Sequence, residues 1–278
     1  MKRILMSCGV AAVVAAGAGG AVAVSAGAAA PAVPKVIYDS SVSPLPANLP
    51  SVGPEAYSFT EFGDQVTFAG TNRNLKNVTV TLSSWACQSG SWTTHNCVSA
   101  KGATFAVPVT FNIYAPTTTG GVNTAGTLIA TQTNTYHVPY RPSTDARCAG
   151  GGWFTKGSCF NGIASNITFD FTGTNVPNTV VYGITYNTSH YGPSPLGETP
   201  ACYAAPAGCP YDSLNIGLAP KVNVGSKPFA DTVFQNAVYA ADYCDGGTDG
   251  VGFMRLDSAV PNTCWAGYNP AVDFTATK

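Results

Sequence analysis

The pattern of apolar and polar positions predicts short β-strands joined by turns. Residues 78–82 alternate apolar side chains with threonine, and a two-residue period in β-branched residues is typical of a strand with one buried face. The 3.6-residue period of an amphipathic helix does not occur along the chain. On this basis we expect strands at residues 57–62, 65–68, 78–83, 104–114, 127–138, 167–171, 180–186, 214–218 and 232–240.

Three local signals add detail to this set of strands. Pro108 lies inside the expected strand at 104–114, and proline lacks the N–H of a ladder bond, so this strand is expected at a sheet edge or a bulge. The threonine- and glycine-rich residues 116–126 are expected to form a turn. Strands 167–171 and 180–186 are expected to pair as a hairpin across the turn at 173–178.

Eight to ten strands without helical periodicity indicate an all-β fold, and we expect a single β-sandwich, jelly-roll-like, with long disulfide-braced loops. No fixed-period repeat of a propeller or solenoid occurs. The sandwich domain is expected at residues 55–278. A Pro/Ala/Ser-rich N-terminal arm is expected at 31–54, with an edge strand at 36–38.

The first 30 residues have the composition of a signal peptide. Lys2 and Arg3 precede an apolar segment at 4–24, and Ala-Gly-Ala at 26–28 fits a cleavage site. The apolar segment is long enough for a retained membrane anchor, which is the alternative. Its glycine and alanine content and the proline-rich stretch that follows favour cleavage. We therefore expect a secreted, extracellular protein with no membrane attachment after signal cleavage.

Composition excludes one class of partner. Only 10% of the residues are charged, and the formal net charge is −1. Because a nucleic-acid-binding surface needs clustered lysine and arginine to neutralise phosphates, we expect no nucleic acid among the partners.

Eight of the nine cysteines follow the predicted signal peptide and form four couples that are local in sequence. In an exported chain an even number indicates disulfides, and the CxxC spacing of structural zinc sites is absent. We expect the sequential pairs Cys87–Cys97, Cys148–Cys159, Cys202–Cys209 and Cys244–Cys264.

Four segments carry a resemblance to known proteins. They read EFGDQVTFAGTNRNLKNVTVTLSSWAC, YHVPYRP, CFNGIASNITFDF and VVYGITYNTSHYGPSP. Together they resemble a recurring type of bacterial secreted β-sandwich protein, over about residues 55–220. The resemblance implies export and a β-sandwich fold, and it brings no activity and no catalytic residue with it.

The four tryptophans lie beside or between members of a cysteine couple. A tryptophan in a disulfide-braced loop offers a rigid apolar plane that can stack on a sugar ring. The alternative is that each indole covers its neighbouring disulfide. Trp92 and Trp153 lie in the middle of their loops and are expected to be exposed, ligand-binding residues. Trp85 and Trp265 lie next to a cysteine and are expected to pack on the disulfides.

Two further groups of residues are candidate sites. Asp242, Asp245 and Asp249 lie in a glycine-rich loop and could bind calcium, although the spacing is not that of an EF-hand and a solvated acidic turn is the alternative. No other cofactor is indicated. The stretch from Tyr136 through His137 and Tyr140 to Arg141 has side chains that a polysaccharide lyase uses, with His137 and Arg141 expected on one strand face. The alternative is that this stretch completes a sheet edge.

Taken together, these observations favour a secreted, non-catalytic module that binds a polysaccharide or cell-envelope glycan through its tryptophan-bearing loops. A purely structural extracellular or envelope protein is the second hypothesis. A carbohydrate-active enzyme, either lyase or hydrolase, is the third, and the sequence contains no GxSxG, HExxH or P-loop motif to support it.

Overall fold

The computed structural model describes residues 33–192, 208–258 and 264–278, which belong to one compact unit. The predicted signal peptide at 1–30 lies outside the described residues. The strands are β1 Lys35–Asp39, β2 Ser51–Val52, β3 Phe59–Thr67, β4 Asn74–Ser84, β5 Thr104–Thr119, β6 Val122–Pro139, β7 Trp153–Thr155, β8 Ser158–Phe160, β9 Ile163–Asp170, β10 Thr179–Thr185, β11 Leu214–Ala219, β12 Thr232–Ala237, β13 Arg255–Ser258, β14 Asn269–Pro270 and β15 Val272–Thr277. Two short 3₁₀ helices, η1 at Pro210–Ser213 and η2 at Ala240–Asp242, accompany them.

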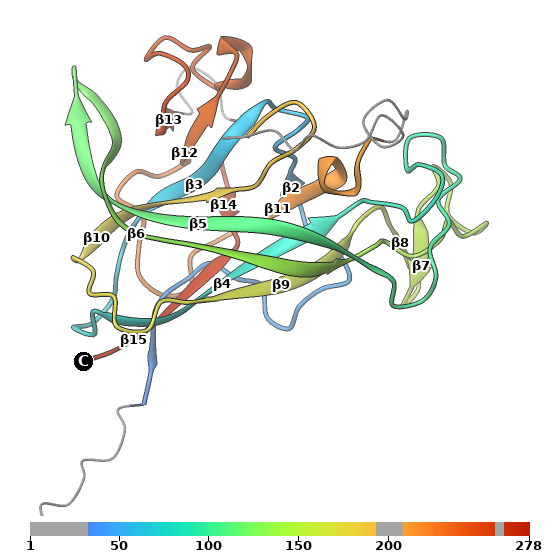
Figure 1. The fold of residues 1–278 in the computed structure, drawn as a ribbon, viewed down its shortest axis with the longest axis horizontal. Coiled ribbons are helices and arrows are strands. Elements are labelled where there is room, and N and C mark those ends of the chain that lie inside the picture. The colour runs from blue at the N-terminus through green and yellow to red at the C-terminus, as the bar shows by residue number, and fades with distance from the viewer. Residues whose placement is uncertain (1–32, 193–207, 259–263) are drawn as a thin grey trace, which may run out of the picture. The chain divides into compact units, whose positions relative to one another are not determined.

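Two sheets pack against each other (Figure 1). The first has the order β1-β15-β4-β11-β14, with β2 added on β11 and β9 added on β4. The second is barrel-like, because β10, β3, β12, β13, β6 and β5 close on one another. Strands β7 and β8 form a separate pair. The predicted all-β architecture is confirmed as a sandwich or barrel-like arrangement, whereas a jelly-roll order is not confirmed.

Aromatic side chains fill the space between the two sheets. Phe111 of β5 stacks on Tyr182 of β10, with ring centroids 5.4 Å apart. Across the interface, Phe111 lies 5.7 Å from Phe274 of β15 and 5.5 Å from Phe169 of β9. All four rings are fully buried. Burial of a large apolar side chain contributes about 1.5–3 kcal/mol, so this cluster fixes how the two sheets pack.

The hairpin expected from residues 167–171 and 180–186 is wrong. Strand β9 pairs with β4 in the first sheet, whereas β10 pairs with β3 and β5 in the second. The reason is visible in the burial of the two strands, since β9 has one exposed face and β10 is buried on both. The turn at 173–178 therefore carries the chain from one sheet to the other.

Strands β5 and β6 form a long hairpin that crosses the whole view in Figure 1. The expected turn at 116–126 is shorter than predicted, because pairing continues to Thr119 and Val122. Gly120 and Gly121 make the turn with φ of +60° and +89°, as a type I′ hairpin requires. Strand β5 lies between β10 and β6 in the closed sheet, so the edge strand expected from Pro108 is wrong. Pro108 lies outside the part of β5 that pairs with β10, which begins at Thr110, so it interrupts no ladder to β10.

The segment expected to be an N-terminal arm contributes to the sheet. Strand β1 pairs with β15 at the edge of the first sheet, which agrees with the edge strand expected at 36–38. Ile37 and Tyr38 are buried in the main core, and Val52 of β2 joins them. Residues 33–54 are thus part of the β domain, because their apolar side chains complete its core.

Candidate functional site

The disulfides follow the predicted local pairing wherever both cysteines are described. Cys87–Cys97, Cys148–Cys159 and Cys244–Cys264 are formed, with Cα–Cα distances of 5.3, 5.6 and 5.9 Å. Cys209 is also disulfide-bonded, and its predicted partner Cys202 lies outside the described residues. Three disulfides indicate folding in an oxidising compartment. Within the described ranges, no helix is long and apolar enough to cross a membrane.

Two of the disulfides belong to one substructure, which we call the disulfide lobe (residues 85–100 and 141–162, including β7 and β8). Arg141 is 1% exposed and donates from Nη2 to the Gly151 carbonyl at 2.5 Å, while its backbone N–H donates to the Ala86 carbonyl at 2.9 Å. The Thr144 N–H donates to the Cys97 carbonyl at 2.9 Å. These bonds join the two Cys-bounded loops into one unit.

The expected exposure of Trp153 is wrong. Its side chain is 9% exposed, its Nε1 donates to the Gly162 carbonyl at 2.7 Å, and its ring lies 5.6 Å from that of Phe160. A buried indole is favourable when its N–H finds an acceptor. Trp153 is therefore a packing residue of the disulfide lobe.

Trp92 is exposed, as the sequence predicted. It is 38% exposed, and its ring meets the half-buried ring of Trp85 edge-on, at 5.0 Å and 85°. Trp85 donates from Nε1 to Ser83 Oγ at 3.2 Å. Trp85 thus supports Trp92, which presents an aromatic surface to solvent.

The residues that suggested a lyase do not share one cleft. Arg141 is buried in the disulfide lobe, where burial lowers the pKa of its guanidinium, whereas His137 is exposed on β6. The Tyr136 hydroxyl donates to the Thr168 carbonyl at 2.8 Å. The expectation of a shared face for His137 and Arg141 fails because β6 ends at Pro139, before the alternation reaches Arg141.

The predicted calcium ligands are not brought together. Asp245 forms a bidentate pair with the fully buried Arg255, at 2.7 and 3.0 Å. Asp242 accepts a hydrogen bond from the Ser58 hydroxyl, and Asp249 lies exposed further along the loop. Within the described residues, no group of three or more His, Cys, Asp or Glu side chains is placed to hold a metal ion. Because Asp245 neutralises a buried guanidinium, it is not available as a ligand.

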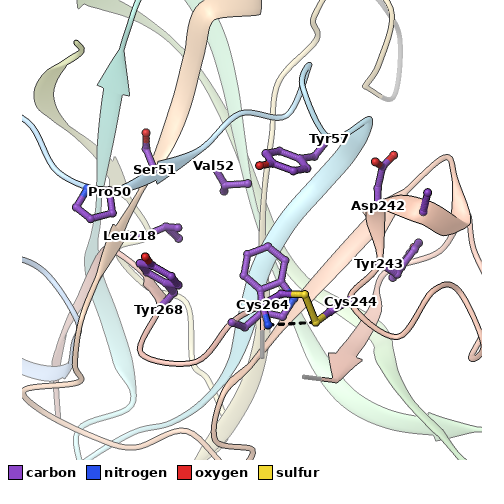
Figure 2. Close-up of a pocket in the computed structure, with 12 residues that line it drawn as sticks. Pro50, Ser51, Val52, Tyr57, Leu218, Asp242, Tyr243, Cys244, Cys264 and Tyr268 are labelled. Atoms are coloured by element: carbon purple, nitrogen blue, oxygen red, sulfur yellow. Dashed lines mark hydrogen bonds between the residues drawn. A yellow bond between two sulfur atoms is a disulfide. The ribbon is translucent and has the colours of Figure 1, made fainter. Parts of the chain in front are cut away.

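A groove beside the Cys244–Cys264 disulfide is the site that sequence reasoning missed. Its volume is about 460 Å³, and its lining includes Tyr57, Leu218, Asp242, Trp265 and Tyr268. These residues come from segments far apart in sequence, and we call the site the aromatic groove. Figure 2 shows Tyr57, Tyr268 and Asp242 beside it on three separate stretches of the chain.

The floor of the aromatic groove is rigidly held. Trp265 is 8% exposed and donates from Nε1 to Asp257 Oδ2 at 2.7 Å. The fully buried Asp257 also accepts from the Cys244 N–H at 2.9 Å and from Gln235 Nε2 at 3.0 Å. Burial raises the pKa of the Asp257 carboxyl above its usual range, against the lowering effect of these donors. One carboxylate therefore connects the disulfide, the indole and strand β12.

The walls of the groove are two exposed tyrosines. Tyr57 is 50% exposed, and its ring stacks on Phe59 at 5.7 Å, which begins an aromatic row that reaches Trp265 through Phe62. Tyr268 is 40% exposed and closes a turn by donating its N–H to the Trp265 carbonyl at 3.0 Å. Gly267 permits this turn with φ of +71°. The same turn thus directs Trp265 inward and leaves Tyr268 exposed.

Asp242 connects the groove to a neighbouring set of side chains that we call the polar rim (Glu55, His190, Tyr191, Tyr239 and Asp242). Glu55 pairs with His190 and also accepts from the Thr188 hydroxyl. The rings of Tyr191 and Tyr239 lie 6.3 Å apart, edge to face. The pKa of Tyr191 is raised by burial and, to a smaller extent, by Tyr239, Glu55 and Asp242. The Asp242 N–H donates to the Tyr239 carbonyl at 3.2 Å, and the Tyr191 N–H donates to the Thr188 hydroxyl at 3.1 Å. These contacts link the two carboxylates and the two phenols.

The arrangement of groove and rim is suited to a ligand with both flat apolar faces and hydroxyl groups. Aromatic planes stack on the C–H faces of sugar rings, and carboxylate oxygens accept hydrogen bonds from hydroxyls. The sequence analysis singled out Asp242 and Trp265 of this site for other roles, and gave no signal for its exposed tyrosines. Comparisons with protein families, with curated protein sequences and with solved structures found no match to this chain.

Proposed function

We propose that this protein is a secreted, non-catalytic module that binds a polysaccharide or cell-envelope glycan through the aromatic groove. The observation that supports this most directly is the pair of exposed tyrosines, Tyr57 and Tyr268, above the buried indole of Trp265. The predicted signal peptide and the three disulfides support the extracellular location.

The size and chemistry of the groove fit a sugar ligand. Small-ligand sites are typically clefts of about 300–1,000 Å³ with aromatic walls and a few polar groups, and the aromatic groove has 460 Å³ and the Asp242 carboxylate. Each stacking contact contributes about 0.5–1.5 kcal/mol beyond burial of its area. A site with two or three such contacts binds weakly, with Kd in the micromolar to millimolar range.

Trp92 is a second contact in this proposal. It is exposed, it is held against Trp85, and the disulfide Cys87–Cys97 closes its loop. A polysaccharide is long enough to contact more than one surface of a small protein. Trp153 has no part in binding, because its indole is buried.

The test is titration of the mature protein with envelope and plant-type polysaccharides, using Tyr57→Ala, Tyr268→Ala and the exposed control Phe253→Ala. Loss of one stacked ring at about 1.4 kcal/mol lowers affinity about tenfold. We expect that loss for both tyrosine variants and an unchanged Kd for the phenylalanine variant, with melting temperatures close to wild type throughout.

Two outcomes would contradict the proposal. Absence of binding to every polysaccharide would remove the glycan-binding function. If Tyr57→Ala and Tyr268→Ala instead lost several degrees in melting temperature without any change in affinity, both rings would be packing residues. The protein would then be better described as a structural extracellular or envelope protein.

A further inference from the structure

We propose that the aromatic groove and the polar rim select a polysaccharide with free amino groups, such as a chain of β-1,4-linked glucosamine. This inference rests on the proposed glycan-binding function and specifies its ligand class. It follows from which charged groups line the site and from the aromatic faces next to them.

The charge on the described lining of the groove is negative. Among the described residues that line it, Asp242 is the only charged side chain. The guanidinium of Arg255 lies close to the lining, 4.0 Å from the centre of the Tyr243 ring. Arg255 is fully buried and already paired with Asp245, so it does not neutralise Asp242. A ligand in the groove therefore meets a negative potential.

The polar rim extends this negative character beyond the groove. Glu55 lies two residues before Tyr57 and contributes a second carboxylate, which is paired with the half-exposed side chain of His190. The Asp242 carboxylate accepts its hydrogen bond from the neutral Ser58 hydroxyl, so this contact does not balance its charge. Uronic acid polymers would be repelled at this surface, while an ammonium group would be attracted.

Tyrosine faces beside the carboxylates make the site more specific than an acidic surface. Tyr57 and Tyr239 are 50% and 56% exposed, and Tyr191 packs edge-on against Tyr239. An ammonium within about 6 Å of a phenol ring is attracted by the ring quadrupole. A hydroxyl or an acetamide gains neither this interaction nor the charge attraction. A glucosamine unit can stack its ring in the groove and place its ammonium against the rim.

The experiment compares three tetrasaccharides by titration calorimetry at low salt: the β-1,4 glucosamine tetramer with protonated amines, its N-acetylated counterpart and tetragalacturonate. An exposed ion pair changes affinity about two- to five-fold. We expect the glucosamine tetramer to bind at least that much more tightly than the acetylated one, and tetragalacturonate to bind most weakly. At 0.5 M NaCl the difference should nearly vanish, because exposed charges are screened.

Substitutions of single carboxylates test which of them cause the preference for the glucosamine tetramer. Asp242→Asn and Glu55→Gln should each lower the affinity for the glucosamine tetramer about two- to five-fold more than the affinity for the acetylated tetramer, because only the glucosamine tetramer loses an ion pair. Asp249→Asn is the matched control, because it makes the same change in net charge at an exposed position seven residues along the loop. It should leave all three affinities unchanged.

The outcomes separate this inference from the proposed function. Equal binding of the glucosamine and acetylated tetramers, insensitive to Asp242→Asn, would overturn the charge selectivity and leave glycan binding intact. An equal loss in Asp249→Asn and Asp242→Asn would show an effect of net charge and overturn the local subsite. Failure of every saccharide, including the polysaccharides, would remove the proposed function itself.

Discussion

The disulfide lobe and the aromatic groove both combine tryptophan with disulfides, but they expose different aromatic side chains. Each places tryptophan beside disulfide-bonded cysteines, and the two regions lie apart in Figure 1, with β7 and β8 at the right and the loops after β12 at the top. In the disulfide lobe Trp153 turns inward and Trp92 outward. In the groove the indole of Trp265 turns inward, and tyrosines from other loops form the exposed surface.

The difference is explained by where each indole N–H finds an acceptor. Trp153 donates to the Gly162 carbonyl, and Trp265 donates to the Asp257 carboxylate. Both acceptors are buried with the ring, so burial costs no hydrogen bond. Trp153 and Trp265 are therefore packing residues, whereas the exposed Trp92 is a candidate binding residue.

The largest expected effect contrasts Trp265 with Trp92. Trp265→Ala should lower the free energy of unfolding by about 3–5 kcal/mol, because it leaves a cavity and takes a donor away from Asp257. Trp92→Ala should change it by less than about 0.5 kcal/mol, because the ring is exposed. Equilibrium urea unfolding measures both. Equal losses of unfolding free energy in the two variants would show that both rings are packing residues and would contradict the proposed difference between them.

The disulfides should have similar effects on stability and different effects on binding. Replacing both cysteines of Cys148–Cys159 or of Cys244–Cys264 with serine should cost about 3 kcal/mol in the chain-entropy account, since the closed loops span 11 and 20 residues. Removal of Cys244–Cys264 should also abolish glycan binding, because this disulfide lines the groove. Denaturation and titration of the two double variants test this. Loss of binding in the Cys148/Cys159 variant would show that the lobe supports the site.

Two carboxyl groups, one from each region, have pKa values shifted in opposite directions and should change stability in opposite ways as pH rises. Burial raises the pKa of Asp257, whereas hydrogen bonds from the Arg147 side chain lower the pKa of Asp145 to about 2. The window begins at the ordinary aspartate pKa near 3.8 and extends up to the raised pKa of folded Asp257. Within it the folded chain keeps a proton that the unfolded chain has lost, so the contribution of Asp257 to the free energy of unfolding falls as pH rises. Asp145 contributes stability that is present above about 3.8 and is lost as pH falls towards 2.

Asp257→Asn should therefore flatten the decline in stability as pH rises above about 4. Asp145→Asn should alter only the range from about 2 to 4, and by little, because Asp145 and Arg147 are solvent-screened. Urea unfolding of the two variants from pH 2 to 8 gives both profiles, and the other carboxylates cancel in the comparison. Identical profiles above pH 4 for wild type and Asp257→Asn would contradict the shift assigned to burial.

The smallest expected effect concerns calcium. Millimolar calcium should leave the melting temperature unchanged relative to chelator, because Asp245 is already paired with Arg255 and the three aspartates do not converge. A rise in melting temperature that chelator reverses would show that the acidic loop rearranges to bind calcium. It would contradict the conclusion that the three aspartates do not form a metal site.

Much of the fold could be predicted from alternation, since one buried face imposes a two-residue period. The expected strands at 78–83 and 214–218 match β4 and β11 within a few residues. Strand β15 was missed, because its six residues become a strand only between β1 and β4. The three-residue strands β7 and β8 were missed for a similar reason, as each forms only against the other.

Features that depend on neighbours along the chain could be predicted from the sequence alone. Alternation specified an all-β architecture, and local cysteine couples specified three disulfides. Tertiary structure decided the features that depend on distant neighbours, such as the assignment of β9 and β10 to different sheets. The groove belongs to this second group, because Tyr57 and Tyr268 are 211 positions apart in sequence and meet only when β3 and the last loops pack around Asp257. Burial and hydrogen bonding between such segments are properties of the packed chain, and no local pattern encodes them.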